Sequence, residues 1–204
     1  MLTFIIVLPS DIPTAVKPSE ANLLLQVASG GVVLECGAFY GFSTVMLAQV
    51  ARLVHSVDWH RGDEHAGQVD TLPDYLENLK RYNVTDRVIT HLGRFEDVLP
   101  YLRRGSFDGC FLDGQHDRAS LDRDLRLIHP LIGRTGWIAV HDYGLFDVAP
   151  ALEDFVSWSG YELVRVAETL AVLRPRVHLA RKAARRLPEP VRRTVRQVMR
   201  HLPS

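Results

Sequence analysis

The sequence contains few cysteines: only Cys36 and Cys110 occur in 204 residues. Two cysteines cannot build the multiple-disulfide framework that stabilises small secreted domains. Both lie within apolar, strand-like segments, which favours buried, reduced thiols in a reducing compartment. Their strands are expected to be neighbours in the sheet inferred below, so a single disulfide between them is the alternative.

Long hydrophobic runs are also missing. The apolar run at residues 4–8 (FIIVL) is too short to span a bilayer. No basic residue precedes it and no A-x-A-like site follows it, so it does not match a secretory signal peptide. We therefore expect a cytoplasmic protein. The hydrophobic content of 47% excludes disorder throughout, and the length of 204 residues suits one domain plus an appendage.

The formal net charge is zero, but the charges are unevenly distributed. Residues 174–204 hold 10 of the 24 Lys and Arg residues and one of the 24 acidic residues, which leaves 14 basic and 23 acidic residues in 1–173. This split predicts a domain over residues 1–174 and a separate basic tail over 175–204. In residues 191–202, apolar side chains recur at helical spacing between arginines, a pattern typical of a basic amphipathic helix. Such a tail could hold the protein peripherally at an anionic membrane surface, bind RNA, or pack on the domain or on a second subunit.

The most informative motif lies in residues 32–44, VVLECGAFYGFST, where an apolar strand leads through a two-glycine turn into a helix. Glycines let the backbone approach a ligand closely, and the following helix points free N–H groups at it. The turn lacks the second and third glycines of the dinucleotide pattern G-x-G-x-x-G, which disfavours a dehydrogenase. Asp58 ends the next strand 23 residues after Glu35, at a place where a carboxylate commonly binds ribose hydroxyls.

Strand-length apolar runs alternate with segments of helical period along the domain. We predict helices over residues 18–29, 42–51, 72–82, 95–102, 119–131 and 148–157, and strands over 32–36, 53–58, 87–92, 107–112, 136–140, 161–167 and 170–173. Alternation of this kind indicates an α/β fold. The expected architecture is a Rossmann-like, doubly wound sheet, mostly parallel, with an antiparallel C-terminal hairpin at its edge.

The pattern E-x-G-x-x-x-G-x-S-T, followed by a strand that ends in Asp, resembles motif I of class I S-adenosylmethionine-dependent methyltransferases. Within that class it is most similar to the small-molecule O-methyltransferase branch, and the order of elements matches along about 150 residues. The resemblance implies S-adenosylmethionine as the cofactor. The residues implied to bind it are Glu35, Gly37, Ala38, Gly41, Ser43, Asp58, Trp59, Arg94 and Asp113.

The end of the fourth strand bears on the substrate. Methyltransferases that modify base amines resemble one another in an Asn/Asp-Pro-Pro-aromatic loop at this place. This chain has Asp113-Gly114-Gln115-His116 instead. An oxygen nucleophile fits better, because a hydroxyl needs a base or a metal ion to become reactive. We therefore expect a hydroxylated small-molecule acceptor that is sugar-bearing, phenolic or lipid-linked.

Two ways of activating the hydroxyl stay open, and both use Asp113 and Asp142. In the first, Asp113, His141 and Asp142 hold a divalent cation such as Mg²⁺ or Mn²⁺. The catechol-type branch has Asp-Asn after its fifth strand, whereas Tyr143 follows Asp142 here. In the second, His116 acts as the general base.

Other interpretations also remain. The polar loop 60–65 has residue types suited to a metal site, but its sequence is also typical of a loop that covers the cleft. A non-catalytic module that binds S-adenosylmethionine, or an RNA methyltransferase that uses the basic tail, are the alternative functions.

Overall fold

A computed structural model describes residues 6–62 and 67–176 of the chain. The basic amphipathic helix predicted in the tail, and most of the tail itself, therefore lie outside the described residues. Within these two segments, no helix combines the length and the apolar character needed to cross a lipid bilayer.

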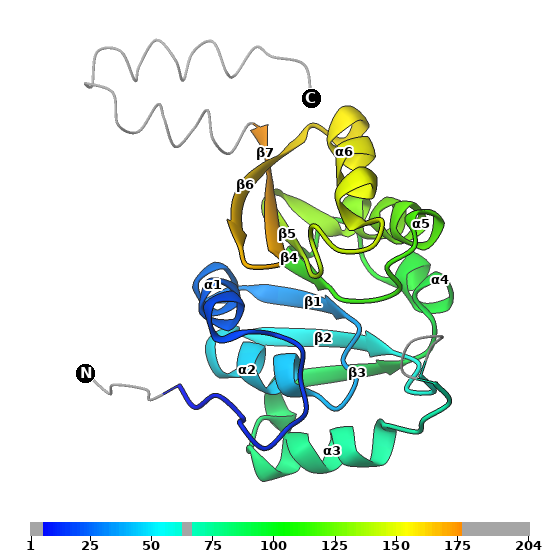
Figure 1. The fold of residues 1–204 in the computed structure, drawn as a ribbon. Coiled ribbons are helices and arrows are strands. Elements are labelled where there is room, and N and C mark those ends of the chain that lie inside the picture. The colour runs from blue at the N-terminus through cyan, green and yellow to red at the C-terminus, as the bar shows by residue number, and fades with distance from the viewer. Residues whose placement is uncertain (1–5, 63–66, 177–204) are drawn as a thin grey trace, which may run out of the picture.

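Seven strands form a single sheet in the order β3-β2-β1-β4-β5-β7-β6 (Figure 1). The pairs from β3 to β5 are parallel, and β7 is antiparallel to both of its neighbours, β5 and β6. The strands are β1 (Val32–Cys36), β2 (Leu53–Asp58), β3 (Val88–Leu92), β4 (Phe107–Leu112), β5 (Ile132–Val140), β6 (Tyr161–Ala167) and β7 (Leu170–Pro175). The predicted fold, a mostly parallel doubly wound sheet with an antiparallel C-terminal hairpin, is confirmed.

Helices cover both faces of the sheet (Figure 1). They are α1 (Pro18–Ala28), α2 (Phe42–Val50), α3 (Leu72–Arg81), α4 (Phe95–Val98), α5 (Arg118–Ile128) and α6 (Val148–Ser159), with 3-10 turns η1 (Thr85–Arg87), η2 (Leu99–Tyr101) and η3 (His129–Leu131). One core cluster joins α1, α2 and α3 to the sheet, and a second joins α4, α5 and α6 to it. The chain therefore buries both faces of the central strands, as parallel sheets require.

The side chains of β5 alternate between the two cores. Trp137 and Ala139 pack on the α1 side of the sheet, while Ile138 and Val140 pack on the α5 side. This period of two continues past the end of the strand, so His141 is directed toward α1. The alternation thereby brings an ionisable side chain to the buried junction between the sheet and the first helix.

Two strand boundaries differ from the prediction. β5 begins at Ile132 rather than at residue 136, because Ile132 already pairs with Phe107. A register irregularity and polar residues then separate Ile132 from the apolar run that begins at residue 136. β7 continues to Pro175, which pairs with Tyr161, so strand pairing reaches the first residue of the predicted tail.

Both cysteines are buried free thiols on the neighbouring strands β1 and β4. Cys110 pairs in register with Leu34, and Cys36 pairs with Leu112. The expectation of buried thiols is therefore confirmed, and the disulfide alternative is wrong.

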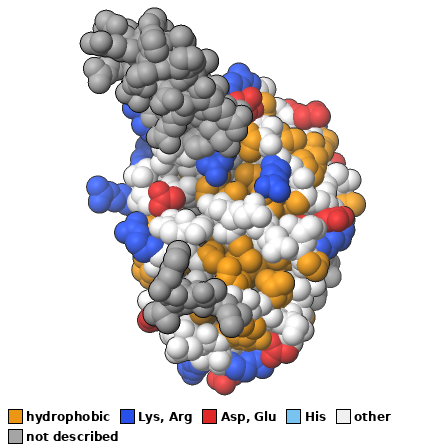
Figure 2. Space-filling view, turned by 90° about the vertical axis from the view of Figure 1, so that its left-hand side faces the viewer, with side chains coloured by type: hydrophobic (Ala, Val, Ile, Leu, Met, Phe, Trp, Pro, Cys, Tyr) orange, Lys and Arg blue, Asp and Glu red, His pale blue; other side chains and the backbone are white. Residues whose placement is uncertain are grey.

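The surface on the left of Figure 1 is of mixed character. Figure 2 shows hydrophobic side chains gathered in patches on this face, with Lys, Arg, Asp and Glu side chains between and around them. Exposed hydrophobic side chains are ordinary on the surface of a folded domain.

Candidate active site

The glycine turn after β1 is shaped by contact with the end of β4. Gly37 has a φ of 96°, and a Cβ at this position would lie 1.8 Å from the carbonyl oxygen of Asp113. Only glycine fits such an approach. Gly41 has a φ of 89° and is the N-cap residue of α2. The turn therefore needs both glycines, one for close packing and one for its left-handed backbone.

Asp58, at the end of β2, holds the same turn from the other side. Its Oδ2 accepts hydrogen bonds from the backbone N–H groups of Ala38 (2.7 Å) and Phe39 (2.9 Å), and its Oδ1 accepts one from His60 N (2.7 Å). A carboxylate offers about four acceptor positions, so it can bind a ligand hydroxyl as well. Asp58, the residue predicted to bind the ribose, thus also supports the glycine turn.

Glu35 lies beneath the turn and does not line the cavity. Its side chain is fully buried, and its Oε2 accepts a 2.5 Å hydrogen bond from Thr44 Oγ1 on α2. Burial raises the pKa of Glu35 to about 7, although hydrogen bonds from Thr44 and other hydroxyls oppose the shift. Glu35 was predicted to bind the cofactor, but its buried position favours support of the turn over contact with a cofactor.

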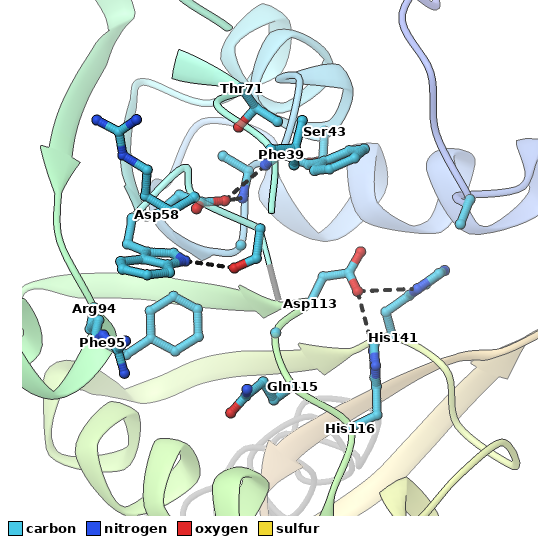
Figure 3. A pocket seen from close by; sticks show the side chains of 18 of the residues that line it. Phe39, Ser43, Asp58, Thr71, Arg94, Phe95, Asp113, Gln115, His116 and His141 are labelled. Atoms are coloured by element: carbon cyan, nitrogen blue, oxygen red, sulfur yellow. Dashed lines mark hydrogen bonds and ion pairs between the residues drawn. The ribbon is translucent and has the colours of Figure 1, made fainter. Parts of the chain in front are cut away.

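A cavity of about 1390 Å³ opens at the carboxyl ends of the parallel strands. The predicted cofactor residues that line it are Gly37, Ala38, Ser43, Asp58, Trp59, Arg94 and Asp113; Gly41 and Glu35 do not line it. In Figure 3, Asp58 and Phe39 lie on one side of this space, and Asp113, His116 and His141 on the other. A single cavity therefore joins the glycine turn to the predicted catalytic residues.

Trp59 and Arg94 form a wall of this cavity. The Arg94 guanidinium lies 4.5 Å from the centroid of the Trp59 ring, and Trp59 Nε1 donates a hydrogen bond to the Gly62 carbonyl oxygen (2.8 Å). Contacts of this kind fix the plane of the indole. Trp59 was predicted to bind the cofactor, and this arrangement suits its ring as a surface for a flat group such as adenine.

Two carboxylates and two histidines meet where β4 and β5 end, and we call Asp113, His116, His141 and Asp142 the acid-histidine cluster. His116 Nε2 lies 3.0 Å from Asp142 Oδ2 and 3.6 Å from Asp113 Oδ1. His141 Nδ1 lies 3.4 Å from Asp113 Oδ1 and 3.5 Å from Asp142 Oδ1. Figure 3 shows Asp113 connected to both histidines. The structure thus brings together all four residues predicted for catalysis and metal binding.

Mutual charge stabilises this cluster. Contacts with Asp113 and Asp142 raise the pKa of His116 to about 9, against the effect of burial. Burial alone lowers the pKa of His141, but the same carboxylates outweigh it and raise that pKa to about 11. Burial acts to raise the pKa of Asp113, yet the two histidines hold it below its ordinary value, and they also lower the pKa of Asp142. The cluster favours bound positive charge between its carboxylates.

Among the described residues, one group of three side chains could hold a metal ion: Asp113, His141 and Asp142, whose ligand atoms all lie within 4.8 Å of one another. Nδ1 of His141 is buried and has no hydrogen-bond partner. An unpaired ring nitrogen aimed at two carboxylates fits a divalent cation. The residues present are therefore chemically suited to the predicted metal.

The loop 60–65 is only partly described, since residues 63–66 lie outside the described segments. His60 is buried, and its Nδ1 lies 2.8 Å from Thr71 Oγ1. That contact occupies one ring nitrogen within the protein. A metal site in this loop stays a prediction.

Sequence reasoning missed two parts of the site. Phe146, in the loop after β5, stacks on the His116 ring with centroids 5.2 Å apart, and its side chain is 63% exposed. The segment from Pro13 to Val16, before α1, also lines the cavity. Neither carries a motif, because each is placed by tertiary packing alone.

The family model for a methyltransferase domain matches residues 34–143, more than half of the chain. No curated protein matches the sequence significantly. Among solved structures, cofactor-bound Rv0187 from MTB is 25% identical over 81% of this chain and 84% of its own, with a TM-score of 0.66. The O-methyltransferase TomG from Streptomyces achromogenes, in complex with SAM, is 19% identical over 79% of this chain and 81% of its own (TM-score 0.62).

A third similar structure is that of the O-methyltransferase NovP, which is 16% identical over 79% of this chain and 81% of its own, with a TM-score of 0.66. The fold is therefore the one found in structures of the predicted branch. The matched residues contain the glycine turn, Asp58 and the whole acid-histidine cluster. The chain belongs to the methyltransferase domain family, and it is a class I S-adenosylmethionine-dependent methyltransferase, as its glycine motif predicted.

Proposed function

We propose that the protein transfers the methyl group of S-adenosylmethionine to a hydroxyl oxygen of a small molecule bound in the cavity. The observation that carries this proposal is the continuity of the cavity, which reaches from the glycine turn to the acid-histidine cluster. The similar structures include two O-methyltransferases, one of them in complex with SAM, which supports the same chemistry. The acceptor class stays as expected above: a sugar-bearing, phenolic or lipid-linked metabolite.

The cofactor would be held at the glycine-turn end of the cavity. Asp58 and the Trp59–Arg94 wall are the groups placed to bind its nucleoside part. Bound S-adenosylmethionine supplies an electrophilic methyl group on a sulfonium sulfur. The walls of the cavity would align the acceptor oxygen with that methyl group and exclude water.

The acceptor hydroxyl would lie against the acid-histidine cluster. A cation held by Asp113, His141 and Asp142 would lower the pKa of the hydroxyl by its charge. In the alternative, His116 takes the proton, with Asp142 fixing the orientation of its ring at 3.0 Å. The exposed Phe146 ring beside His116 offers an apolar surface for a flat acceptor.

Methyl transfer from isotopically labelled S-adenosylmethionine to a panel of phenols, glycosides and lipid-linked alcohols tests the proposal, with mass spectrometry locating the label on oxygen. Activity that is lost in chelator and restored by Mg²⁺ or Mn²⁺ would support the cation. If the protein stays fully active in chelator and the His116→Ala variant is inactive, His116 is the base that takes the proton of the acceptor hydroxyl. Cofactor binding without turnover on any hydroxylated acceptor would favour a non-catalytic module.

A further inference from the structure

Glu20, on α1, is a buried carboxylate that reaches the acid-histidine cluster from outside it. Its side chain is 0% exposed, and its Oε2 lies 3.2 Å from His141 Nε2, across 121 residues of sequence. Oε1 accepts hydrogen bonds from Thr169 N and Thr169 Oγ1, both at 2.7 Å, and Oε2 accepts one from Lys17 N at 2.7 Å. Donors from three separate parts of the chain thus fix this carboxylate in place.

All of these contacts require Glu20 to act as an acceptor. A carboxylate facing Nε2 holds the proton of a neutral imidazole on that nitrogen, which leaves the lone pair on Nδ1. Nδ1 then faces Asp113 Oδ1 at 3.4 Å and Asp142 Oδ1 at 3.5 Å without a hydrogen bond to either. With no metal ion bound, the two carboxylates hold a proton on Nδ1, and a divalent cation that binds among the three atoms displaces this proton.

The two distances from His141 Nδ1, 3.4 Å and 3.5 Å, are close to those found around a shared cation. Ligand atoms about 2.1 Å from one ion lie roughly 3.0 to 3.4 Å apart in octahedral or tetrahedral arrangements. A histidine that binds a metal usually donates its other ring N–H to a carboxylate, which is the relation of His141 to Glu20. The nitrogen also affects the choice of ion, because Mg²⁺ prefers all-oxygen sites and imidazole favours transition metals.

We propose that Glu20 is a positioning residue that makes His141 Nδ1 a ligand of a divalent-cation site shared with Asp113 and Asp142, and that this site selects a transition-metal ion over Mg²⁺. The proposal rests on the cation of the proposed function and adds its nitrogen ligand, its positioning residue and its selectivity. It does not depend on which hydroxyl is methylated.

Calorimetric titration of the chelator-treated full chain with Co²⁺ and, separately, with Mg²⁺ tests the selectivity. We expect Co²⁺ to bind at least tenfold more tightly than Mg²⁺. Bound Co²⁺ should also show visible absorption bands that change in His141→Ala. Equal affinity for the two ions, or no binding of either, would overturn the proposal. Calorimetry with S-adenosylhomocysteine on the same protein tests the proposed function separately. If the cation test fails but the cofactor still binds, the proposal of methyl transfer is not contradicted.

Two variants test the role of Glu20. Glu20→Gln replaces one acceptor oxygen with an N–H donor, and we expect a 10- to 100-fold loss of Co²⁺ affinity. Thr169→Val is the matched control, because it removes a hydrogen bond to Glu20 but leaves the contact with His141; its Co²⁺ affinity should stay within about threefold of wild type. Equal losses in the two variants would assign Glu20 a merely structural role. If Glu20→Gln does not fold, the wild-type ion preference and the spectrum of His141→Ala still decide whether His141 is a ligand of a site that selects a transition-metal ion.

Discussion

Gly37 and Asp113 lie in contact across the ends of β1 and β4, so that any Cβ at residue 37 would overlap the Asp113 carbonyl oxygen. Gly37, the first residue of the glycine turn, is therefore next to the first member of the acid-histidine cluster. This contact couples the shape of the predicted cofactor site to the position of Asp113.

Substitution of Gly37 should disrupt both the shape of the cofactor site and the position of Asp113. We expect Gly37→Ala to lose cofactor affinity by more than tenfold, because the methyl group must displace the Asp113 backbone. Gly105→Ala is the matched control: Gly105 also has a positive φ, 67°, but has no atom within 4 Å of an added Cβ. Calorimetry with S-adenosylhomocysteine measures both variants. Equal affinities would show that the close approach is not needed for binding.

Asp58 offers a second test of the turn. Asp58→Asn replaces one acceptor oxygen with a donor that faces backbone N–H groups, so we expect cofactor binding to weaken by about 1.5 to 3 kcal/mol. Asp86→Asn, an exposed change at η1, should bind as wild type does. If Asp58→Asn retains wild-type affinity, neither the turn nor the ribose depends on this carboxylate.

Glu35 should make the stability of the protein depend on pH. Its pKa in the folded state is about 7, above that of the unfolded chain, so its contribution is fully present below pH 4.5 and is lost as pH rises toward 7. The loss can reach about 3 kcal/mol, since one pKa unit corresponds to about 1.4 kcal/mol. Glu35→Gln keeps an acceptor for Thr44 and should abolish this part of the pH dependence.

Urea unfolding of wild type and Glu35→Gln at several pH values checks the prediction. The variant should gain stability relative to wild type as pH rises from 4.5 to 7, with no further change above it. A constant difference across this range would mean that Glu35 is ionised in the folded protein.

The basic tail lies outside the described residues except for its first two, so its role stays a prediction. We expect a chain ending at Arg176, which keeps all of β7, to bind the cofactor normally and to lose association with anionic liposomes in low salt. Co-sedimentation with anionic and neutral vesicles measures this. Equal sedimentation with and without residues 177–204 would contradict membrane binding, and RNA binding lost on truncation would favour the RNA alternative.

The fold could be predicted from sequence because local signals agreed with tertiary structure. The alternation of strands and helices, the glycine turn and Asp58 carry their meaning within short segments. The meeting of Asp113 with His141 and Asp142 also followed, because parallel strands end at one edge of the sheet.

Other features depend on packing between distant segments. Nothing in the sequence around Glu20 indicates that its side chain contacts His141. The period of two along β5, which points Trp137, Ala139 and His141 toward α1, is the signal that could have suggested it. The stacking of Phe146 on His116 has no such periodic signal.

Binding of the cofactor to the wild-type protein tests the central claim most directly. Calorimetry with S-adenosylmethionine, S-adenosylhomocysteine and NAD should show one site per chain for the first two ligands and none for NAD, because the turn lacks the glycines that a dinucleotide needs. The affinity should fall in Asp58→Asn. A protein that binds NAD and ignores S-adenosylmethionine would contradict the account.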